Sequence, residues 1–183
     1  MSQLAIPKKL APVLEELDSL TQRASVKQLR AMLESADISL EDVEQFAHFS
    51  EKNYRRNLVQ AGTWYHMLIL CWKSGQRSPI HNHAASSCGL KVLSGIATET
   101  VFDFSPCGQV RATSSLDMPA GKIAATQCSD THQISNLQAA NQDLVTLHIY
   151  SPPLLEMDQF SITAPTVEKF TPELFVHTDG SGI

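Results

Sequence analysis

The sequence predicts a mostly β protein, a sandwich or barrel of short strands that follows a helical N-terminal segment. Leucines recur at helical spacing in the first fifty residues, and beyond residue 53 short apolar runs alternate with turn-forming Gly and Pro. The chain has 183 residues, 43% of them hydrophobic, which suits one compact domain with a real core. We therefore expect a single domain over residues 1–183, with a helical part over 1–50 and a β part over 54–170.

Apolar spacing and two capping signals support the helical part. The first apolar stripe comprises Leu10, Val13, Leu14, Leu17 and Leu20. Ser25 with Gln28 resembles a capping box that starts a second helix, and Ser39 with Asp42 resembles another. These stripes predict helices that cover one side of a larger β structure.

Strands are predicted over residues 65–72, 90–93, 98–104, 123–127 and 144–150. The run from Tyr65 to Trp72 is almost continuously apolar, which is typical of a strand buried on both faces. Gly and Pro residues predict turns at 105–108 and 119–121. Short strands and turns at this spacing favour an all-β architecture.

Composition excludes several classes of partner. Fourteen basic and nineteen acidic residues give a formal net charge of −5 without a basic stripe, so we expect neither nucleic acid nor membrane as a partner. No apolar run reaches membrane-spanning length, and the first twenty residues lack the layout of a cleavable signal. The four cysteines form no CxxC pair and are expected as thiols. We expect a cytoplasmic monomer.

Two of the seven histidines, His81 and His83, form an HxH pair. Positions i and i+2 of a strand point to the same face, so both imidazoles can meet one metal ion. Gly75 and Gly95 bracket the pair, and a Pro-Ala-Gly turn at 119–121 precedes His132. This layout resembles the two motifs of cupins, in which the second motif supplies the last histidine ligand.

Cys88 occupies the position at which the cupin pattern usually carries a glutamate ligand. A site of three neutral histidines leaves the +2 charge of a metal uncompensated, unlike the common site of two histidines and one carboxylate. Such a site should attract anions, and the metal charge lowers the pKa of a bound thiol.

The resemblance becomes specific over about half of the chain. The segments YRRNL, ILCWKSGQRSPIHNHAASSCGLKVLSGIATETVFDF, THQISN and LVTLHIYSPP resemble the core of cysteine dioxygenase, in the same order. The resemblance implies a cupin-type β-barrel (jelly roll) with Fe(2+) held by His81, His83 and His132. It also implies the oxidation of L-cysteine by O2 to cysteine sulfinic acid.

The same resemblance implies roles for residues around the metal. Arg56 falls on the arginine that holds the substrate carboxylate, and Tyr54 on a tyrosine near the substrate. Tyr150 falls on the active-site tyrosine, which His148 would orient. Cys88 falls on the cysteine that joins that tyrosine through a thioether, although Gly89 follows directly and many bacterial relatives have glycine at this position. The resemblance also implies a cis bond at 151–152.

Two kinds of rival function remain open. The first is a dioxygenase for another small thiol, 3-mercaptopropionate or cysteamine. Related enzymes for 3-mercaptopropionate carry glutamine at the Arg56 position, so the arginine favours cysteine as substrate. Cysteamine has no carboxylate that Arg56 could hold, which argues against it. The second rival is a non-enzymatic cupin that binds metal. The sequence does not fix the metal either, because three histidines also suit zinc, nickel or copper.

Overall fold

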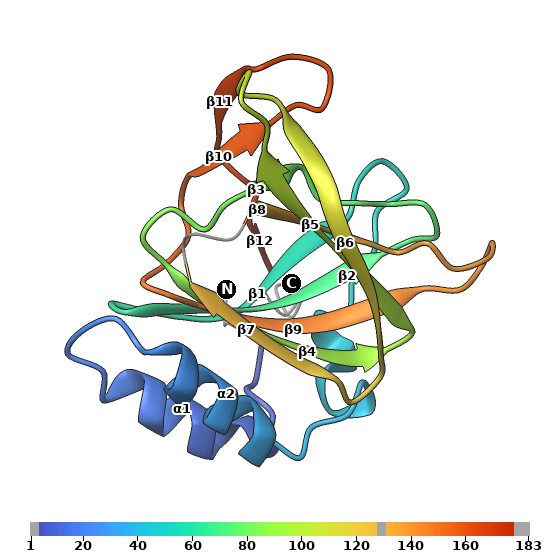
Figure 1. The fold of residues 1–183 in the computed structure, drawn as a ribbon. Coiled ribbons are helices and arrows are strands. Elements are labelled where there is room, and N and C mark those ends of the chain that lie inside the picture. Colours follow the sequence, from blue (N-terminus) through green and yellow to red (C-terminus); the bar gives the residue numbers. More distant parts are fainter. Residues whose placement is uncertain (1–3, 128–130, 178–183) are drawn as a thin grey trace.

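A computed structural model describes residues 4–127 and 131–177, which form two six-stranded sheets with helices on the outer side of one sheet (Figure 1). The helices are η1 (Lys8–Leu10), α1 (Ala11–Asp18), α2 (Val26–Ser35) and η2 (Glu41–Phe46). The mostly β class and the helical N-terminal segment are thereby confirmed.

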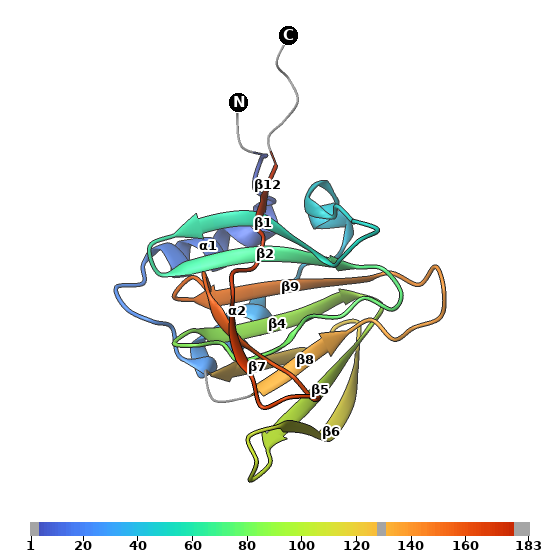
Figure 2. The same ribbon diagram turned by 90° about the horizontal axis from the view of Figure 1, so that it is seen from above.

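The first sheet has the order β12-β1-β2-β9-β4-β7 and the second has the order β11-β10-β3-β8-β5-β6. The first comprises β1 (Arg55–Gly62), β2 (Tyr65–Trp72), β4 (Ser87–Ser94), β7 (Ile123–Gln127), β9 (Leu144–Ser151) and β12 (Phe175–Val176). The second comprises β3 (Ile80–His81), β5 (Ile96–Phe104), β6 (Val110–Pro119), β8 (Thr131–Ser135), β10 (Met157–Phe160) and β11 (Val167–Phe170). From above, β2, β9 and β4 lie side by side across the barrel (Figure 2).

The two capping signals give different outcomes. The Ser25 backbone N–H donates to Gln28 Oε1 at 2.9 Å while Ser25 Oγ accepts from the Gln28 backbone at 3.2 Å, which confirms the capping box of α2. At the second signal, the Ser39 hydroxyl donates to the Asp42 carboxylate instead of accepting a backbone N–H. Only a six-residue 3-10 helix, η2, follows there.

Strand β2 is buried on both faces, as its unbroken apolar run predicts, because each face packs against a different layer. The side chains that pack with the helices include Met67, Ile69 and Cys71. The side chains that face the space between the sheets include Leu68, Leu70 and Trp72. Strand β9 alternates in the same way, so every second side chain of both strands points into the barrel.

Strands β4 and β5 are consecutive in the chain but lie in different sheets. Gly95 makes the turn between them at φ +80°, and a Cβ there would lie 2.6 Å from the Asp143 carbonyl oxygen. The chain can therefore change sheets only because this residue has no side chain. Strand β6 was not predicted, since its largely polar, exposed residues form no apolar run.

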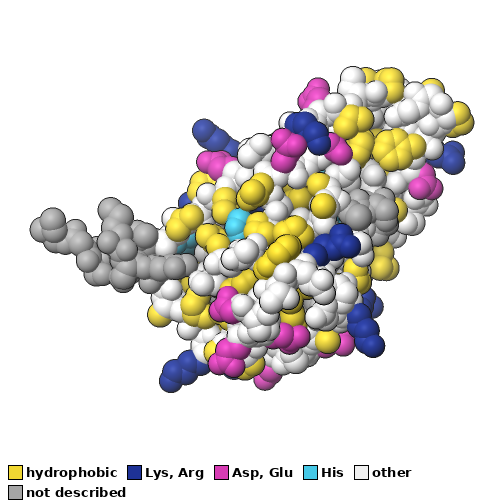
Figure 3. All heavy atoms as spheres, turned by 90° about the vertical axis from the view of Figure 1, so that its left-hand side faces the viewer, with side chains coloured by type: hydrophobic (Ala, Val, Ile, Leu, Met, Phe, Trp, Pro, Cys, Tyr) yellow, Lys and Arg dark blue, Asp and Glu magenta, His cyan; other side chains and the backbone are white. Residues whose placement is uncertain are grey.

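On the face shown in Figure 3, Lys and Arg side chains are scattered among acidic and apolar ones rather than gathered in a stripe. Within the described residues, no helix has the length and apolar character needed to cross a membrane.

Replacing Leu29 by alanine should lower the free energy of unfolding by roughly 2–5 kcal/mol. Leu29 is fully buried where α2 packs on β4. The packing there is tight, because a side-chain carbon added at Gly89 would lie only 3.2 Å from Leu29 Cβ. Chemical denaturation of Leu29→Ala measures the loss. Arg30→Ala, on the exposed side of the same helix, is the control. Equal small losses for both would contradict the packing of α2 on the sheet.

Candidate metal centre

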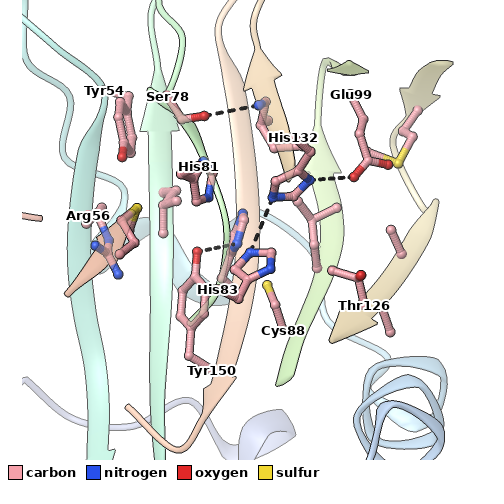
Figure 4. A pocket seen from close by; sticks show the side chains of 18 of the residues that line it. Tyr54, Arg56, Ser78, His81, His83, Cys88, Glu99, Thr126, His132 and Tyr150 are labelled. Atoms are coloured by element: carbon pink, nitrogen blue, oxygen red, sulfur yellow. Dashed lines mark hydrogen bonds and ion pairs between the residues drawn. The ribbon is translucent and has the colours of Figure 1, made fainter. Parts of the chain in front are cut away.

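Three histidines converge inside the barrel, two of them on strands of the second sheet (Figure 4). His81 lies on β3, directly opposite His132 on β8, and His83 follows two residues after His81. One ring nitrogen from each lies within 4.8 Å of the others. His83 Nε2 and His132 Nε2 are 3.3 Å apart, which matches two nitrogens bound to one ion at about 2.0–2.1 Å each.

Burial keeps His81 and His83 neutral. It lowers the pKa of His81 to about 3, with the nearby His132 as a further cause. It also holds the pKa of His83 well below its usual range. Neutral imidazole is the form that binds metals, so these two side chains suit a divalent cation, and the convergence of all three places His132 with them.

Arg56 lies on β1, and only 4% of its surface is exposed. Among the described residues, neither its Nε nor its Nη1 has a hydrogen-bond partner. Its guanidinium carbon lies 5.4 Å from the centre of the Tyr150 ring. Burying a guanidinium with unpaired N–H groups costs free energy unless an anion binds to them. A carboxylate matches the planar arrangement of these groups and can accept two parallel hydrogen bonds.

Tyr54 immediately precedes β1 and forms one wall of the cavity. Its ring stacks on Trp72 with centroids 4.2 Å apart and planes inclined by 9°. Burial raises the pKa of the Tyr54 hydroxyl, which stays protonated at neutral pH. Trp72 itself lines the cavity and is fully buried against Tyr54.

A chain of hydrogen bonds runs along the inward face of β9. Trp72 Nε1 donates to Thr146 Oγ1 at 3.1 Å, and Thr146 Oγ1 lies 3.0 Å from His148 Nε2. His148 Nδ1 lies 3.1 Å from the Tyr150 hydroxyl. Burial raises the pKa of Tyr150 well above its usual value and lowers that of His148, so both groups are neutral.

Cys88 on β4 lies directly opposite Tyr150 on β9 and lines the same cavity. The neighbouring Gly89 faces the other way: a Cβ there would lie 2.8 Å from Leu33 on α2. The sequence left a choice between these two positions, and the structure turns Cys88 toward the histidines. The Ser151–Pro152 bond just beyond β9 is cis.

Most of these side chains line one cavity of about 200 Å³. It is smaller than the roughly 300–1,000 Å³ of sites for drug-sized ligands. The eight residues singled out from the sequence all line it: Tyr54, Arg56, His81, His83, Cys88, His132, His148 and Tyr150. One side of the cavity is apolar, with Leu90, Val101, Met118 and Ile134.

Sequence reasoning missed one charged residue of the cavity, Glu99. Its carboxylate Oε1 lies 2.7 Å from His132 Nδ1. Glu99 is an acidic residue within the predicted strand 98–104, and this position was the one hint that the sequence offered. Its partner, His132, is 33 positions away and belongs to another strand. Only the pairing of β5 with β8 brings the two together.

Comparisons with known proteins agree with this geometry. The family model described as "Cysteine dioxygenase type I" matches residues 1–163. Cysteine dioxygenase type 1 of Danio rerio is 33% identical over 158 residues, which cover 80% of this chain and 76% of the relative. The protein of the same name from Rattus norvegicus is 30% identical over 161 residues, covering 83% and 78%.

Solved structures support the fold independently. An uncharacterised Klebsiella pneumoniae protein with a double-stranded β-helix domain matches with a TM-score of 0.51 and 17% identity, over 60% of this chain and 81% of that one. TT1209 from Thermus thermophilus matches with a TM-score of 0.51 and 16% identity, over 63% and 98%. These likenesses confirm the cupin barrel, and the match of the family model to residues 1–163 shows that the chain belongs to the cysteine dioxygenase type I family.

Proposed function

We propose that the protein is a thiol dioxygenase that converts L-cysteine and O2 to cysteine sulfinic acid at Fe(2+) held by His81, His83 and His132. The observation that carries the proposal is a buried Arg56 in the same small cavity as three convergent histidines. Two nitrogens of its guanidinium have no hydrogen-bond partner among the described residues. Ferrous iron held there would supply a redox-active Lewis acid that lowers the pKa of the substrate thiol and reacts with O2. The reaction balances without another reductant, because both oxygen atoms end on sulfur.

In this proposal Arg56 binds the carboxylate of cysteine and Tyr54 bounds the same end of the cavity. Two parallel N–H···O bonds from the guanidinium would fix the orientation of the amino acid, and the substrate would satisfy the free nitrogens of Arg56. The cavity volume limits the substrate to a small thiol.

The hydrogen-bond chain on β9 directs the proton of Tyr150. Trp72 donates to Thr146, which leaves the Thr146 hydroxyl proton free to bond to His148 Nε2. His148 then carries its proton on Nδ1 and donates to the Tyr150 oxygen. In this arrangement each donor of the chain has an acceptor. The Tyr150 hydroxyl proton is left free to point into the cavity, where it would stabilise negative charge on the substrate.

Oxygen uptake by the iron-loaded protein with a panel of thiols tests the proposal. We expect cysteine to be consumed faster than 3-mercaptopropionate, and cysteamine slowest because it has no carboxylate for Arg56. A preference for 3-mercaptopropionate would assign the chain to the rival thiol dioxygenase. Iron binding without oxygen uptake for any thiol would favour a non-enzymatic cupin.

A thioether between Cys88 and Tyr150 should form during turnover. Directly opposed residues on neighbouring strands have Cβ atoms about 4.5–5.5 Å apart, close enough for a thiol to reach a phenol ring. Formation removes one hydrogen from sulfur and one from the ring, and the two electrons pass to O2, a substrate of the proposed reaction. The bond would hold the ring in place and so speed the reaction without a new contact.

Mass spectrometry of protein that has turned over cysteine detects this bond as a joined peptide pair that has lost two hydrogens. Cys88→Ser should give no joined peptides and a slower but active enzyme. If Cys88 still reacts fully with an alkylating agent in unfolded protein after many turnovers, the thioether is excluded and Cys88 is a packing residue.

We extend the proposal to organisation and location. Residues 1–183 would act as one unit in which the helical part, 1–50, covers the barrel of residues 54–170. The protein would work as a cytoplasmic monomer, in a reducing compartment where Cys71 and Cys107, which form no disulfide in the structure, stay thiols.

A further inference from the structure

The three histidines of the centre differ in what their outward-facing Nδ1 atoms contact. His81 Nδ1 lies 2.9 Å from the Pro79 carbonyl oxygen, a neutral acceptor. His83 Nδ1 is buried and has no hydrogen-bond partner among the described residues. His132 Nδ1 alone of the three meets a carboxylate, that of Glu99, at 2.7 Å. Electrostatically the centre is therefore asymmetric, with one anionic group acting on one ligand.

Sheet geometry fixes this contact. In the pairing of β5 with β8, Val101 lies opposite His132 and Glu99 opposite Ile134. Glu99 and His132 are thus diagonal neighbours on the inward face, at a separation that a long side chain spans. The Glu99 side chain is 22% exposed and that of His132 is 6% exposed, so water screens the pair only in part. Figure 4 shows Glu99 reaching His132 from the side away from His83.

A carboxylate at this place has two consequences for His132. It accepts a hydrogen bond, so the neutral imidazole carries its proton on Nδ1 and keeps the Nε2 lone pair free for a metal. Its negative charge also makes Nε2 a stronger donor and offsets part of the +2 charge that three neutral ligands leave uncompensated.

We propose that Glu99 is a positioning residue that acts through His132 to raise the affinity of the centre for a divalent cation. The inference rests on the proposed metal centre. It assigns to this chain a fourth, indirect contributor to the site: a carboxylate that does not touch the ion but fixes the tautomer and orientation of the ligand that does. The alternative is a structural role, in which Glu99 only stabilises the pairing of β5 with β8.

Metal titration of the protein freed of metal by chelation separates these roles, with Co²⁺ and Zn²⁺ as redox-stable probes. Glu99→Leu removes both the hydrogen bond and the charge, and we expect it to weaken binding roughly 10–100-fold. Glu99→Gln keeps an oxygen that accepts from Nδ1–H but loses the charge, so its affinity should lie between those of Glu99→Leu and the wild type. The visible spectrum of the Co²⁺ form should change in Glu99→Leu, because it reports donor strength directly.

Asp117→Asn is the matched control. Asp117 lies on the adjacent strand β6, accepts a hydrogen bond from Thr98 at 2.6 Å, and its replacement removes the same charge from the same sheet. Its metal affinity should equal that of the wild type. The melting temperatures of the metal-free variants show whether a substitution destabilises the fold. If Glu99→Leu is destabilised, the comparison of Glu99→Gln with the wild type decides the question.

Unchanged Co²⁺ affinity in both Glu99 variants, with the wild type binding tightly, would overturn the inference and leave the metal centre standing. An equal loss in Asp117→Asn would also overturn it, since the effect would then be long-range charge. Failure of the wild type to bind either ion would overturn the metal centre, and the role of Glu99 with it.

Discussion

Replacing His132 by alanine should abolish stable iron binding and, with it, oxygen uptake. The three histidine nitrogens lie within 4.8 Å of one another, and the centre has no carboxylate ligand among the described residues to compensate for a lost imidazole. Loss of an outer partner already costs about 10–100-fold in metal affinity, so loss of a direct ligand should exceed that. Iron content after anaerobic reconstitution measures the effect.

His48→Ala is the control for His132→Ala. His48 stacks on His177 at 3.9 Å and does not line the cavity. This variant should keep full iron content and activity. Full iron occupancy in His132→Ala would remove that residue from the ligand set.

Replacing Arg56 by alanine should damage cysteine turnover far more than replacing Arg55. Loss of one partner of a desolvated charge pair costs about 2–5 kcal/mol, a fall in kcat/KM of roughly 30- to several thousand-fold. Arg55 is the matched control because it is the adjacent arginine of the same strand and its guanidinium lies over Phe175, 4.0 Å from the ring centre. Steady-state kinetics with saturating O2 gives both values.

A second substrate separates a lost clamp from a damaged fold. Cysteamine lacks the carboxylate, so any residual turnover of this amine should fall little in Arg56→Ala while cysteine turnover collapses. Equal losses with Arg55→Ala and Arg56→Ala, or equal losses for both thiols, would show that Arg56 does not hold the carboxylate.

Much of this site could be predicted because its chemistry is encoded locally. The HxH spacing predicts that the side chains of His81 and His83 meet, and they do so although strand β3 ends at His81. The unbroken apolar run of β2 predicts a strand with two buried faces. Cys88 and Gly89 are adjacent in the sequence, and only the packing of α2 on Gly89 shows which of them faces the cavity.

The rest depends on pairings between distant strands. Nothing near Glu99 in the sequence identifies His132 as its partner, because the contact requires the register of β5 against β8. Strand β1 carries Arg56 but begins with polar residues and has no clear apolar alternation, so the strand itself was not predicted. Long-range register, rather than local propensity, decides these features.

The most direct test of the central claim is turnover of cysteine under ¹⁸O2 by the iron-loaded protein, followed by mass spectrometry of the product. The proposed reaction predicts cysteine sulfinic acid in which both oxygen atoms on sulfur are ¹⁸O. Product labelled at one oxygen only, or cystine without label, would show that the protein does not act as a dioxygenase.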